Sequence, residues 1–285
     1  MSEFVERIIN RSLGVQDISN NYSRLPGGIS NEIYRVPTLI NGLAIDLAVT
    51  IIRDPSSWWK IEQEYSFREM LNGDPEVIIP KLYNAGFDYL NDRKFAFIIR
   101  EFLSGEDLDA ALALRMTPNS SEGGMKSLAA DLGRRLAMLH RHETSVFGLV
   151  GRTSEIIYSG WGDYVLGEIE NKSRHLTQLS SDQQIGSVKV VDILNILPAL
   201  HSSIGSLQWS LFEQSSSLLS HGDTHFHNFI ANSDESSTWK INGMIDTDEA
   251  LGGDPEIDIT FIENWLHFAS YGQRFYQHKE DFFNG

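Results

Sequence analysis

The hydrophobic pattern of this chain changes at Ser104-Gly105, and the change limits the folds that the chain can adopt. Before it, short apolar runs alternate with Gly, Pro and Asn, as is typical of strands; the runs cover residues 33–36, 43–52 and 95–102. Asn41-Gly42 lies between the first two runs and predicts a hairpin turn, because both residues tolerate a positive φ. A helix is expected at about 57–71, where Asn-Gly-Asp-Pro ends the pattern.

After Ser104-Gly105 the apolar spacing becomes helical. One stripe of leucines predicts a helix with a buried face: Leu128, Leu132, Leu136 and Leu139. Further helices are expected at 187–203 and 207–219, with exposed loops at 117–124 and 233–237. We therefore expect an α+β protein with a small β-rich N-terminal lobe (1–103) and a larger, mainly helical C-terminal lobe (104–285).

The composition excludes several classes of function. Lys and Arg number 23 against 39 Asp and Glu, a net charge of −16, whereas nucleic acids and anionic membranes require a basic face. The absence of cysteine excludes disulfides, thiolate nucleophiles and cysteine-ligated metals. The start of the chain lacks the pattern of a signal peptide, and no run of eighteen apolar residues occurs. These features predict a cytoplasmic protein with neither a nucleic-acid nor a membrane partner.

The chemistry is concentrated in residues 221–258. This segment holds nine carboxylates and one lysine, so its acidic excess is half that of the chain. Two strand-like pieces flank a turn there and are expected to bring Asp223, Asn228 and Asp246 close together. Any one of these residues would commonly cap a turn. As a set, two carboxylates and a carboxamide offer the oxygen ligands that suit Mg²⁺.

The motifs of this segment, His221-Gly-Asp223, Asn228, Ile245-Asp246 and Gly-Asp-Pro with Asp258, resemble those of the aminoglycoside phosphotransferase family of small-molecule kinases. The Asp-x4-Asn spacing is shared with the catalytic loop of protein kinases, to which that family is related in fold. The resemblance implies a two-lobed protein-kinase-like fold, Asp223 as catalytic base, and Asn228 and Asp246 as Mg²⁺ ligands. It also implies that His221 orients the loop and that Asp258 is structural.

The resemblance extends to the N-terminal part, where it implies a site for ATP or GTP. Residues 25–31 resemble the family's glycine-containing loop, so Gly28, Ser30 and Asn31 are expected near the phosphates. Residues 97–103 resemble the connection between the lobes, where backbone groups near Glu101 and Leu103 would bind the adenine edge.

One expected residue is missing from the nucleotide site. Kinases of this type use a strand lysine that contacts the α- and β-phosphates and pairs with a helix glutamate. Glu64 fits the glutamate, but the position of the lysine falls on Thr50. Arg53 and Lys60 are the basic residues considered as replacements.

The implied reaction is transfer of the γ-phosphoryl group of a nucleoside triphosphate to a hydroxyl of a small molecule. The acidic excess suggests a cationic, aminoglycoside-like acceptor, which Asp248, Glu249 and Glu256 could attract; the family also takes neutral sugars, amino alcohols and macrolides. Two alternatives stay open: a nucleotide-binding pseudokinase, because of Thr50, and a metal hydrolase using the histidines of 221–227 with Asp223. The sequence leaves the oligomeric state undetermined.

Overall fold

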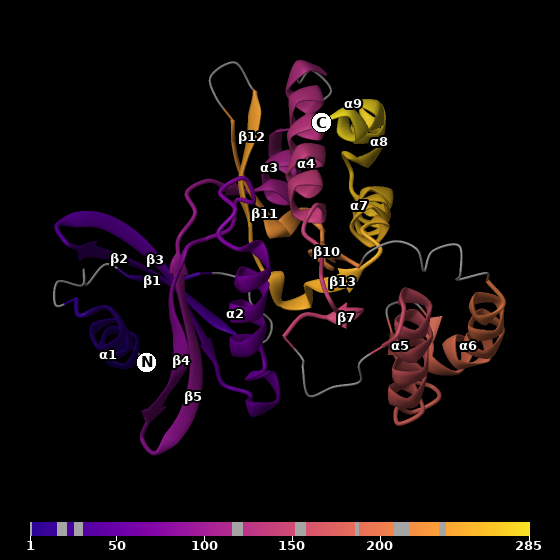
Figure 1. The fold of residues 1–285 in the computed structure, drawn as a ribbon, viewed down its shortest axis with the longest axis horizontal. Coiled ribbons are helices and arrows are strands. Elements are labelled where there is room, and N and C mark those ends of the chain that lie inside the picture. The colour runs from indigo at the N-terminus through magenta and orange to yellow at the C-terminus, as the bar shows by residue number, and fades with distance from the viewer. Residues whose placement is uncertain are drawn as a thin grey trace.

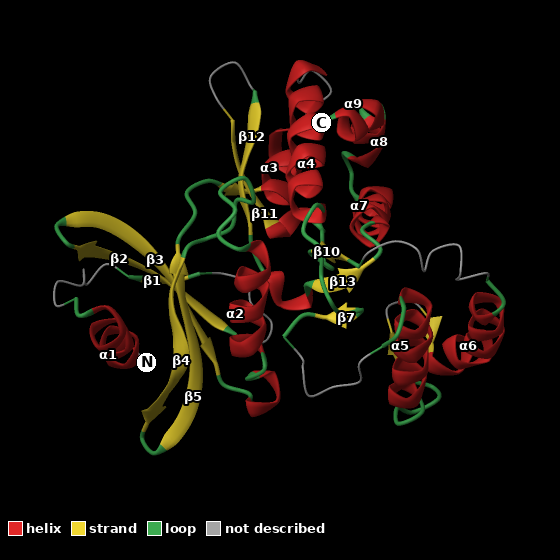
Figure 2. Ribbon diagram, in the orientation of Figure 1, coloured by secondary structure: helices red, strands yellow, loops and turns green. Residues whose placement is uncertain are grey.

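The first part of the chain folds into a five-stranded antiparallel sheet (Figures 1 and 2). In the computed structural model, which describes residues 2–15, 22–25, 31–115, 122–151, 158–185, 188–207, 217–233 and 238–285, the strand order is β1-β2-β3-β5-β4. The strands are β1 (Ser23–Arg24), β2 (Glu32–Ile40), β3 (Leu43–Ile52), β4 (Leu82–Leu90) and β5 (Arg93–Glu101). The predicted turn is confirmed: Asn41 and Gly42 join β2 to β3 with φ of 52° and 79°.

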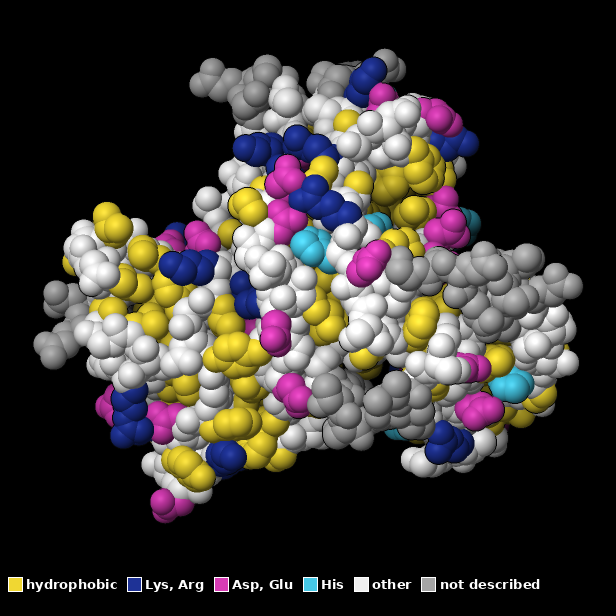
Figure 3. All heavy atoms as spheres, in the orientation of Figure 1, with side chains coloured by type: hydrophobic (Ala, Val, Ile, Leu, Met, Phe, Trp, Pro, Cys, Tyr) yellow, Lys and Arg dark blue, Asp and Glu magenta, His cyan; other side chains and the backbone are white. Residues whose placement is uncertain are grey.

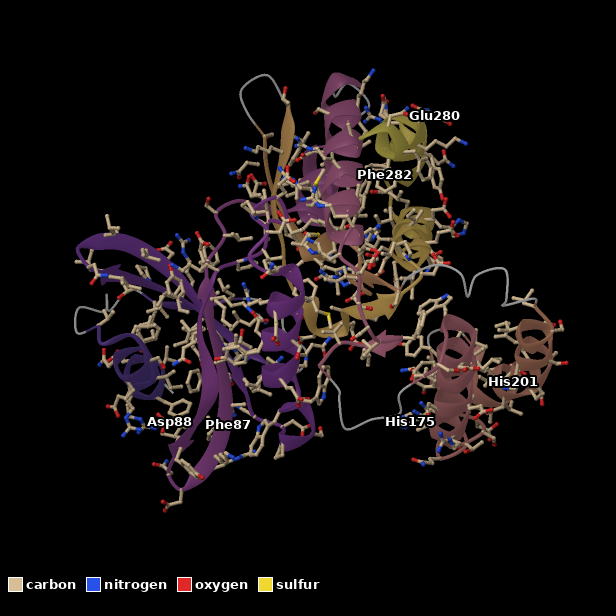
Figure 4. All side chains as sticks on the ribbon, in the orientation of Figure 1. Phe87, Asp88, His175, His201, Glu280 and Phe282 are labelled. Atoms are coloured by element: carbon tan, nitrogen blue, oxygen red, sulfur yellow. The ribbon has the colours of Figure 1, made fainter. Side chains whose placement is uncertain are left out.

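The two faces of this sheet are covered by different helices (Figure 1). Helix α1 (Ser2–Leu13) buries Phe4, Val5, Ile8 and Ile9 against one face, in a cluster with Val36, Leu47 and Val49 among others. Its arginines Arg7 and Arg11 pair with Asp88 on β4, which Figure 4 labels beside α1. Helix α1 was not predicted from the sequence.

Helix α2 (Lys60–Leu71) covers the other face, after the short 3-10 helix η1 (Pro55–Ser57). The apolar contact on this face is small and centres on Ile52, Ala96 and Ile98. Toward the end of β5 the same face carries polar and charged side chains instead. The two faces therefore differ in chemistry. The first is apolar apart from the ion pairs of Asp88 with Arg7 and Arg11, and the second changes from apolar to charged along the strands.

The helical part surrounds a second core. Helix α4 (Glu122–His140) contributes the predicted leucine stripe, each member at most 2% exposed. Helices α3 (Leu108–Arg115), α7 (Glu256–Phe268), α8 (Gly272–Tyr276) and α9 (Lys279–Asn284) lie around it. Figure 4 labels Phe282 on α9 beside α4, where it is buried. Three residues that precede Ser104, namely Phe67, Leu71 and Val77, belong to this same core.

Two three-stranded sheets support the segment 221–258. One has the order β10-β13-β7, from β10 (Leu218–Ser220), β13 (Leu251–Gly253) and β7 (Gly148–Leu149). The other has the order β12-β11-β6, from β12 (Trp239–Met244), β11 (Phe229–Ser233) and β6 (Glu106–Asp107). The predicted hairpin is thus present as β11 and β12.

Helices α5 (Trp161–Leu176) and α6 (Val190–Gly205) pack together at one side of the molecule, with the small hairpin of β8 (Gln184–Ile185) and β9 (Val188–Lys189). The expected helix at 187–203 is α6, which begins three residues later because β9 comes first. The expected helix at 207–219 is wrong at its end, since residues 218–220 pair with β13 as a strand. Residues 208–216, and most of the expected loops at 117–124 and 233–237, lie outside the described residues.

The surface also differs between the two parts. Figure 3 shows hydrophobic side chains gathered over the strand-rich part and charged side chains of both signs over the helical part. Among the exposed apolar residues of the sheet are Leu43, Phe87 and Tyr89. No helix among the described residues combines the length and the apolar character needed to span a bilayer.

Candidate active site

Asp223 lies on the loop between β10 and the 3-10 helix η3 (Phe226–Asn228). The preceding Gly222 has a φ of 78°, and a Cβ atom there would stand 2.0 Å from the carbonyl oxygen of Glu249. Only glycine combines this backbone conformation with so close an approach. Gly222 therefore holds the Asp223 loop against the segment that follows Asp246.

Asp258, on the first turn of α7 (Glu256–Phe268), also holds the loop that carries Asp223. Its side chain is fully buried and accepts hydrogen bonds from the backbone N–H of His221 (2.9 Å) and of Gly222 (2.8 Å). The ring of His140 is 2.8 Å from the same carboxylate, and the hydroxyl of Thr224 donates to the Asp258 carbonyl. A buried carboxylate with this many partners sets the shape of the loop that carries Asp223.

The side chain of Asn228 contacts Asp223 directly. Its Nδ2 donates to the Asp223 carbonyl (2.8 Å) and to Asp223 Oδ2 (3.1 Å). His225 Nε2 lies 3.3 Å from the same carboxylate oxygen. Burial alone would raise the pKa of Asp223, but the hydrogen bond and charge of His225, with a smaller contribution from Asn228, hold it below its ordinary value. The same pairing raises the pKa of His225 against the opposing effect of burial.

Asp246 follows β12 and reaches the same place through the β11–β12 pairing. The backbone N–H of Ile245 donates to the Asn228 carbonyl, and His221 Nε2 is 2.9 Å from the carbonyl oxygen of Ile245. Asp246 itself has a left-handed backbone, with φ of 57°, just before the 3-10 helix η4 (Thr247–Glu249). Asp246 is exposed to solvent, yet the pKa of its carboxyl is raised by desolvation from the surrounding protein and by the charge of Asp248. Lys60 and Arg100 act in the opposite direction and lower it.

The structure therefore brings Asp223, Asn228 and Asp246 together, as the sequence analysis expected. Their chemistry fits Mg²⁺. The amide nitrogen of Asn228 is used by Asp223, which leaves the amide oxygen as the atom that can coordinate a cation. A carboxyl whose pKa is raised by burial and by a neighbouring carboxylate, as at Asp246, is stabilised in its charged form by a bound divalent cation.

Helix α2 contacts the Asp246 segment through polar groups. Buried Gln63 donates to the carbonyl oxygen of Ala250 (3.2 Å), and Lys60 forms a close ion pair with Asp248. Asp248 is thus already neutralised by Lys60. This pairing does not match the expectation that Asp248 attracts a cationic acceptor, because its carboxylate is buried and occupied.

Glu64, one turn further along α2, has a partner that the sequence analysis did not identify. Arg100 on β5 donates to it from Nε (3.1 Å) and Nη2 (2.5 Å), and Arg68 Nε donates to it at 2.8 Å. Burial would raise the pKa of the Glu64 carboxyl, but the two guanidinium groups hold it below its ordinary value. Thr50 is buried on β3 beside this network.

The remaining residues expected at the nucleotide lie around the sheet. Arg53 pairs with Glu32 at 2.6 Å and is largely exposed, and the structure does not bring it into the Glu64 network. Gly28 and Ser30 lie outside the described residues; the side-chain oxygen of Asn31 is buried and has no hydrogen-bond partner among the described ones.

Glu101 and Leu103 end β5 and begin the connection between the two parts of the chain. The backbone N–H of Glu101 already donates to the Lys81 carbonyl (2.8 Å), whereas the backbone N–H and C=O of Leu103 have no hydrogen-bond partner within the part of the chain that the structure describes. Leu103 is therefore the residue of this pair with free main-chain groups for a ligand.

The histidines do not converge as a metal hydrolase would need. His221 points to the Ile245 carbonyl, His225 to Asp223, and His227 to Asp107 at 2.7 Å. Across the described ranges, no three His, Cys, Asp or Glu side chains are grouped so that they could hold a metal ion. The hydrolase alternative therefore finds no site among these residues.

Comparison with known proteins identifies the family of this chain. The model of the phosphotransferase enzyme family matches residues 21–281. The chain belongs to this family. It is accordingly a kinase-type enzyme with the two-lobed, protein-kinase-like fold that the sequence predicted. No curated protein matches the chain.

Several solved structures are similar to this chain. A spectinomycin phosphotransferase in complex with ADP and spectinomycin is 17% identical over 97% of this chain and 79% of its own, with a TM-score of 0.51. WaaP in complex with acyl carrier protein is 11% identical over 96% and 82% (TM-score 0.47). An aminoglycoside phosphotransferase from Alicyclobacillus acidocaldarius is 17% identical over 95% and 75% (TM-score 0.41). At this identity the first of these likenesses shows the fold alone.

Proposed function

We propose that this enzyme transfers the γ-phosphoryl group of ATP or GTP to a hydroxyl group of a small molecule. The observation that carries the proposal is the double contact of Asn228. Its side chain holds Asp223, and its backbone carbonyl accepts from Ile245, the neighbour of Asp246. A proton acceptor and two metal-binding side chains are thereby linked in one hydrogen-bonded unit, as phosphoryl transfer requires.

The proposed chemistry assigns a task to each residue. The Asp223 carboxylate, whose pKa lies below its ordinary value, accepts the proton of the acceptor hydroxyl. The hydroxyl oxygen bonds to the γ-phosphorus while the bond to the β–γ bridging oxygen breaks, and the nucleoside diphosphate leaves. Asn228 and Asp246 would hold Mg²⁺, which would offset the negative charge of the phosphates.

The nucleotide would lie against the N-terminal sheet. The free main-chain groups of Leu103 offer a donor and an acceptor for the edge of a base. Gly28 and Ser30, and Asn31 directly after them in the sequence, are proposed to lie over the phosphates. The complex of the spectinomycin phosphotransferase with ADP supports a nucleotide as the donor.

A cationic acceptor is supported by the acidic groups near Asp223. Asp107 and Asp109 flank His227, at 2.7 and 3.5 Å, and the ring of Trp265 lies 5.1 Å from that of His225, the partner of Asp223. Glu249 and Glu256 are exposed, so their charges would act on an acceptor at longer range. Carboxylates and an aromatic face are the groups that recognise ammonium ions.

The direct test is a nucleoside diphosphate release assay with and without Mg²⁺ and a panel of acceptors: spectinomycin, aminoglycosides, amino alcohols and neutral sugars. We expect Mg²⁺-dependent release that needs one class of acceptor and that Asp223→Asn abolishes. Tight nucleotide binding with no transfer to any acceptor would instead support the pseudokinase alternative.

Ionic strength tests the cationic acceptor separately. Exposed charges are screened beyond about 10 Å at 0.1 M salt. We therefore expect kcat/KM for the acceptor to fall steeply between low and moderate salt, while the KM for the nucleotide changes less. A flat response on the true acceptor would exclude electrostatic attraction and leave the phosphotransfer proposal intact.

A further inference from the structure

Arg100 on β5 carries a largely buried guanidinium on the face of the sheet that α2 covers. The side chain is 16% exposed and its partner Glu64 is 2% exposed. Thr50, at the expected lysine position, is paired across the sheet with Ile98, and Arg100 is two residues further along the same strand. Side chains two apart on a strand share a face, so Thr50 and Arg100 lie diagonally on the α2 side of the sheet.

The distance between these positions is one that a long side chain can span. Diagonal neighbours on adjacent strands are separated by about 7–8 Å. The guanidinium of Arg100 consequently reaches Glu64, the residue that a strand lysine would contact in this fold. Arg100 binds Glu64 through Nε and Nη2, so one terminal nitrogen is not used in this pair.

Arg100 is surrounded by carboxylates. Burial would lower the pKa of Arg100, but Glu64 first, and Asp248 and Asp246 to a smaller extent, raise it. Asp248 is held by Lys60, so Lys60 is occupied in the structure. Arg53 pairs with Glu32 and is largely exposed. Of these three cations, Arg100 is the one that donates hydrogen bonds to Glu64.

We propose that Arg100 anchors the phosphates of the nucleotide in place of the strand lysine. The inference rests on the proposed function, because it assigns a contact within that nucleotide site. A guanidinium is planar and offers several donors, so Arg100 can keep Glu64 through one edge and bind a phosphate oxygen through the other. The absence of a basic residue at position 50 then does not imply a pseudokinase.

The test compares two ligands that differ only in phosphates. The affinities of Mg-ATP and of adenosine are measured by calorimetry for the wild type, Arg100→Gln, Lys60→Gln, Arg53→Gln and the control Arg141→Gln. Arg141 is also paired with two carboxylates, Asp74 and Glu76, but on the helical part. We expect Arg100→Gln to weaken Mg-ATP at least about tenfold, as loss of a charge-assisted contact should. Adenosine binding should be unchanged, and Arg141→Gln should match the wild type.

A second variant covers the case in which Arg100→Gln disturbs folding. Glu64→Gln/Arg100→Gln removes both charges of this pair, while Arg68 keeps its hydrogen bond to the Pro80 carbonyl. It should also lose affinity for Mg-ATP and keep that for adenosine. Equal Mg-ATP affinity in the wild type and in both Arg100 variants overturns the inference alone, as does a selective loss on Lys60→Gln or Arg53→Gln instead. An equal loss for both ligands shows a structural role and also overturns it. A wild type that binds no nucleotide overturns the proposed function and this inference with it.

Discussion

Two buried carboxylates organise the two parts of this molecule, and they do so by different means. Asp258 in the helical part accepts mainly from backbone N–H groups, those of His221 and Gly222. Glu64 in the strand-rich part accepts from two side chains, the guanidiniums of Arg68 and Arg100. A carboxylate bound to backbone fixes the path of a loop, whereas one bound to guanidiniums fixes the position of charges. The first arrangement should tolerate substitution less than the second, and four variants test this ranking.

Asp258→Asn should have the largest effect. The carboxylate of Asp258 accepts from several donors, and the NH₂ group of an asparagine would face at least one of them. The buried pair with His140 would also be lost. We expect a loss of about 3–5 kcal/mol in the free energy of unfolding, measured by denaturant titration. Activity should fall as well, because the loop of Asp223 loses its support. Glu263→Gln, on the exposed face of the same helix, serves as the control and should change neither.

Asp223→Asn should separate chemistry from loop geometry. The substitution removes the proton acceptor while Asp258 and Gly222 still fix the loop. We expect kcat to fall at least about 10²-fold with little change in the free energy of unfolding or in the affinity for Mg-nucleotide. Retention of most of the turnover would remove Asp223 from the catalytic role.

Glu64→Gln should cost less than Asp258→Asn, about 1–3 kcal/mol at neutral pH, because the charged acceptor of three hydrogen bonds from Arg68 and Arg100 becomes a neutral amide. The pKa of Glu64 is lowered in the folded protein from the ordinary value of 4.5. Its contribution to stability is therefore complete above pH 4.5 and is lost as the pH falls through the lowered pKa. Melting curves between pH 3 and pH 7 should show a shallower acid decline for Glu64→Gln than for the wild type. An identical decline would show that the ion pairs do not stabilise the fold.

Glu32→Gln is the matched case with an exposed arginine partner and should have the smallest effect. Glu32 pairs with Arg53, whose side chain is 46% exposed, and its pKa is also lowered, by hydrogen bonds from Tyr34 and Arg53 that outweigh burial. Solvent screening limits such pairs to less than about 1 kcal/mol. A loss as large as that of Glu64→Gln would show that burial does not distinguish the two glutamates.

The local signals in the sequence predicted much of the fold. The Asn41-Gly42 turn and the strand 43–52 are confirmed because turn chemistry and apolar runs act over a few residues. The helix α1 was missed, although Phe4, Val5, Ile8 and Ile9 form one apolar face, because its partner is a sheet that begins later in the chain. Asn91 and Asp92, which join β4 to β5 with positive φ values, are residue types that favour such a turn and could have predicted this hairpin.

The site was predictable in one half only. Asp223, Asn228 and Asp246 lie within one hairpin and its flanks, so their spacing in the sequence predicted that they lie close together. The partner of Glu64 depends on which strands are neighbours, and β5 lies next to β3 only through the sheet order. For that reason the sequence offered Arg53 and Lys60, and the structure pairs Arg100 with Glu64.

The core of the helical part has a consequence for attempts to divide the chain. Phe67, Leu71 and Val77 come before Ser104 in sequence, yet they are buried in that core. A fragment that begins at residue 104 would expose the apolar surface that these side chains cover, and the complementary fragment would expose the side chains themselves. The two fragments should therefore aggregate when each is expressed alone and regain solubility when they are co-expressed. We therefore expect that neither lobe folds alone and that the smallest unit able to fold contains both lobes.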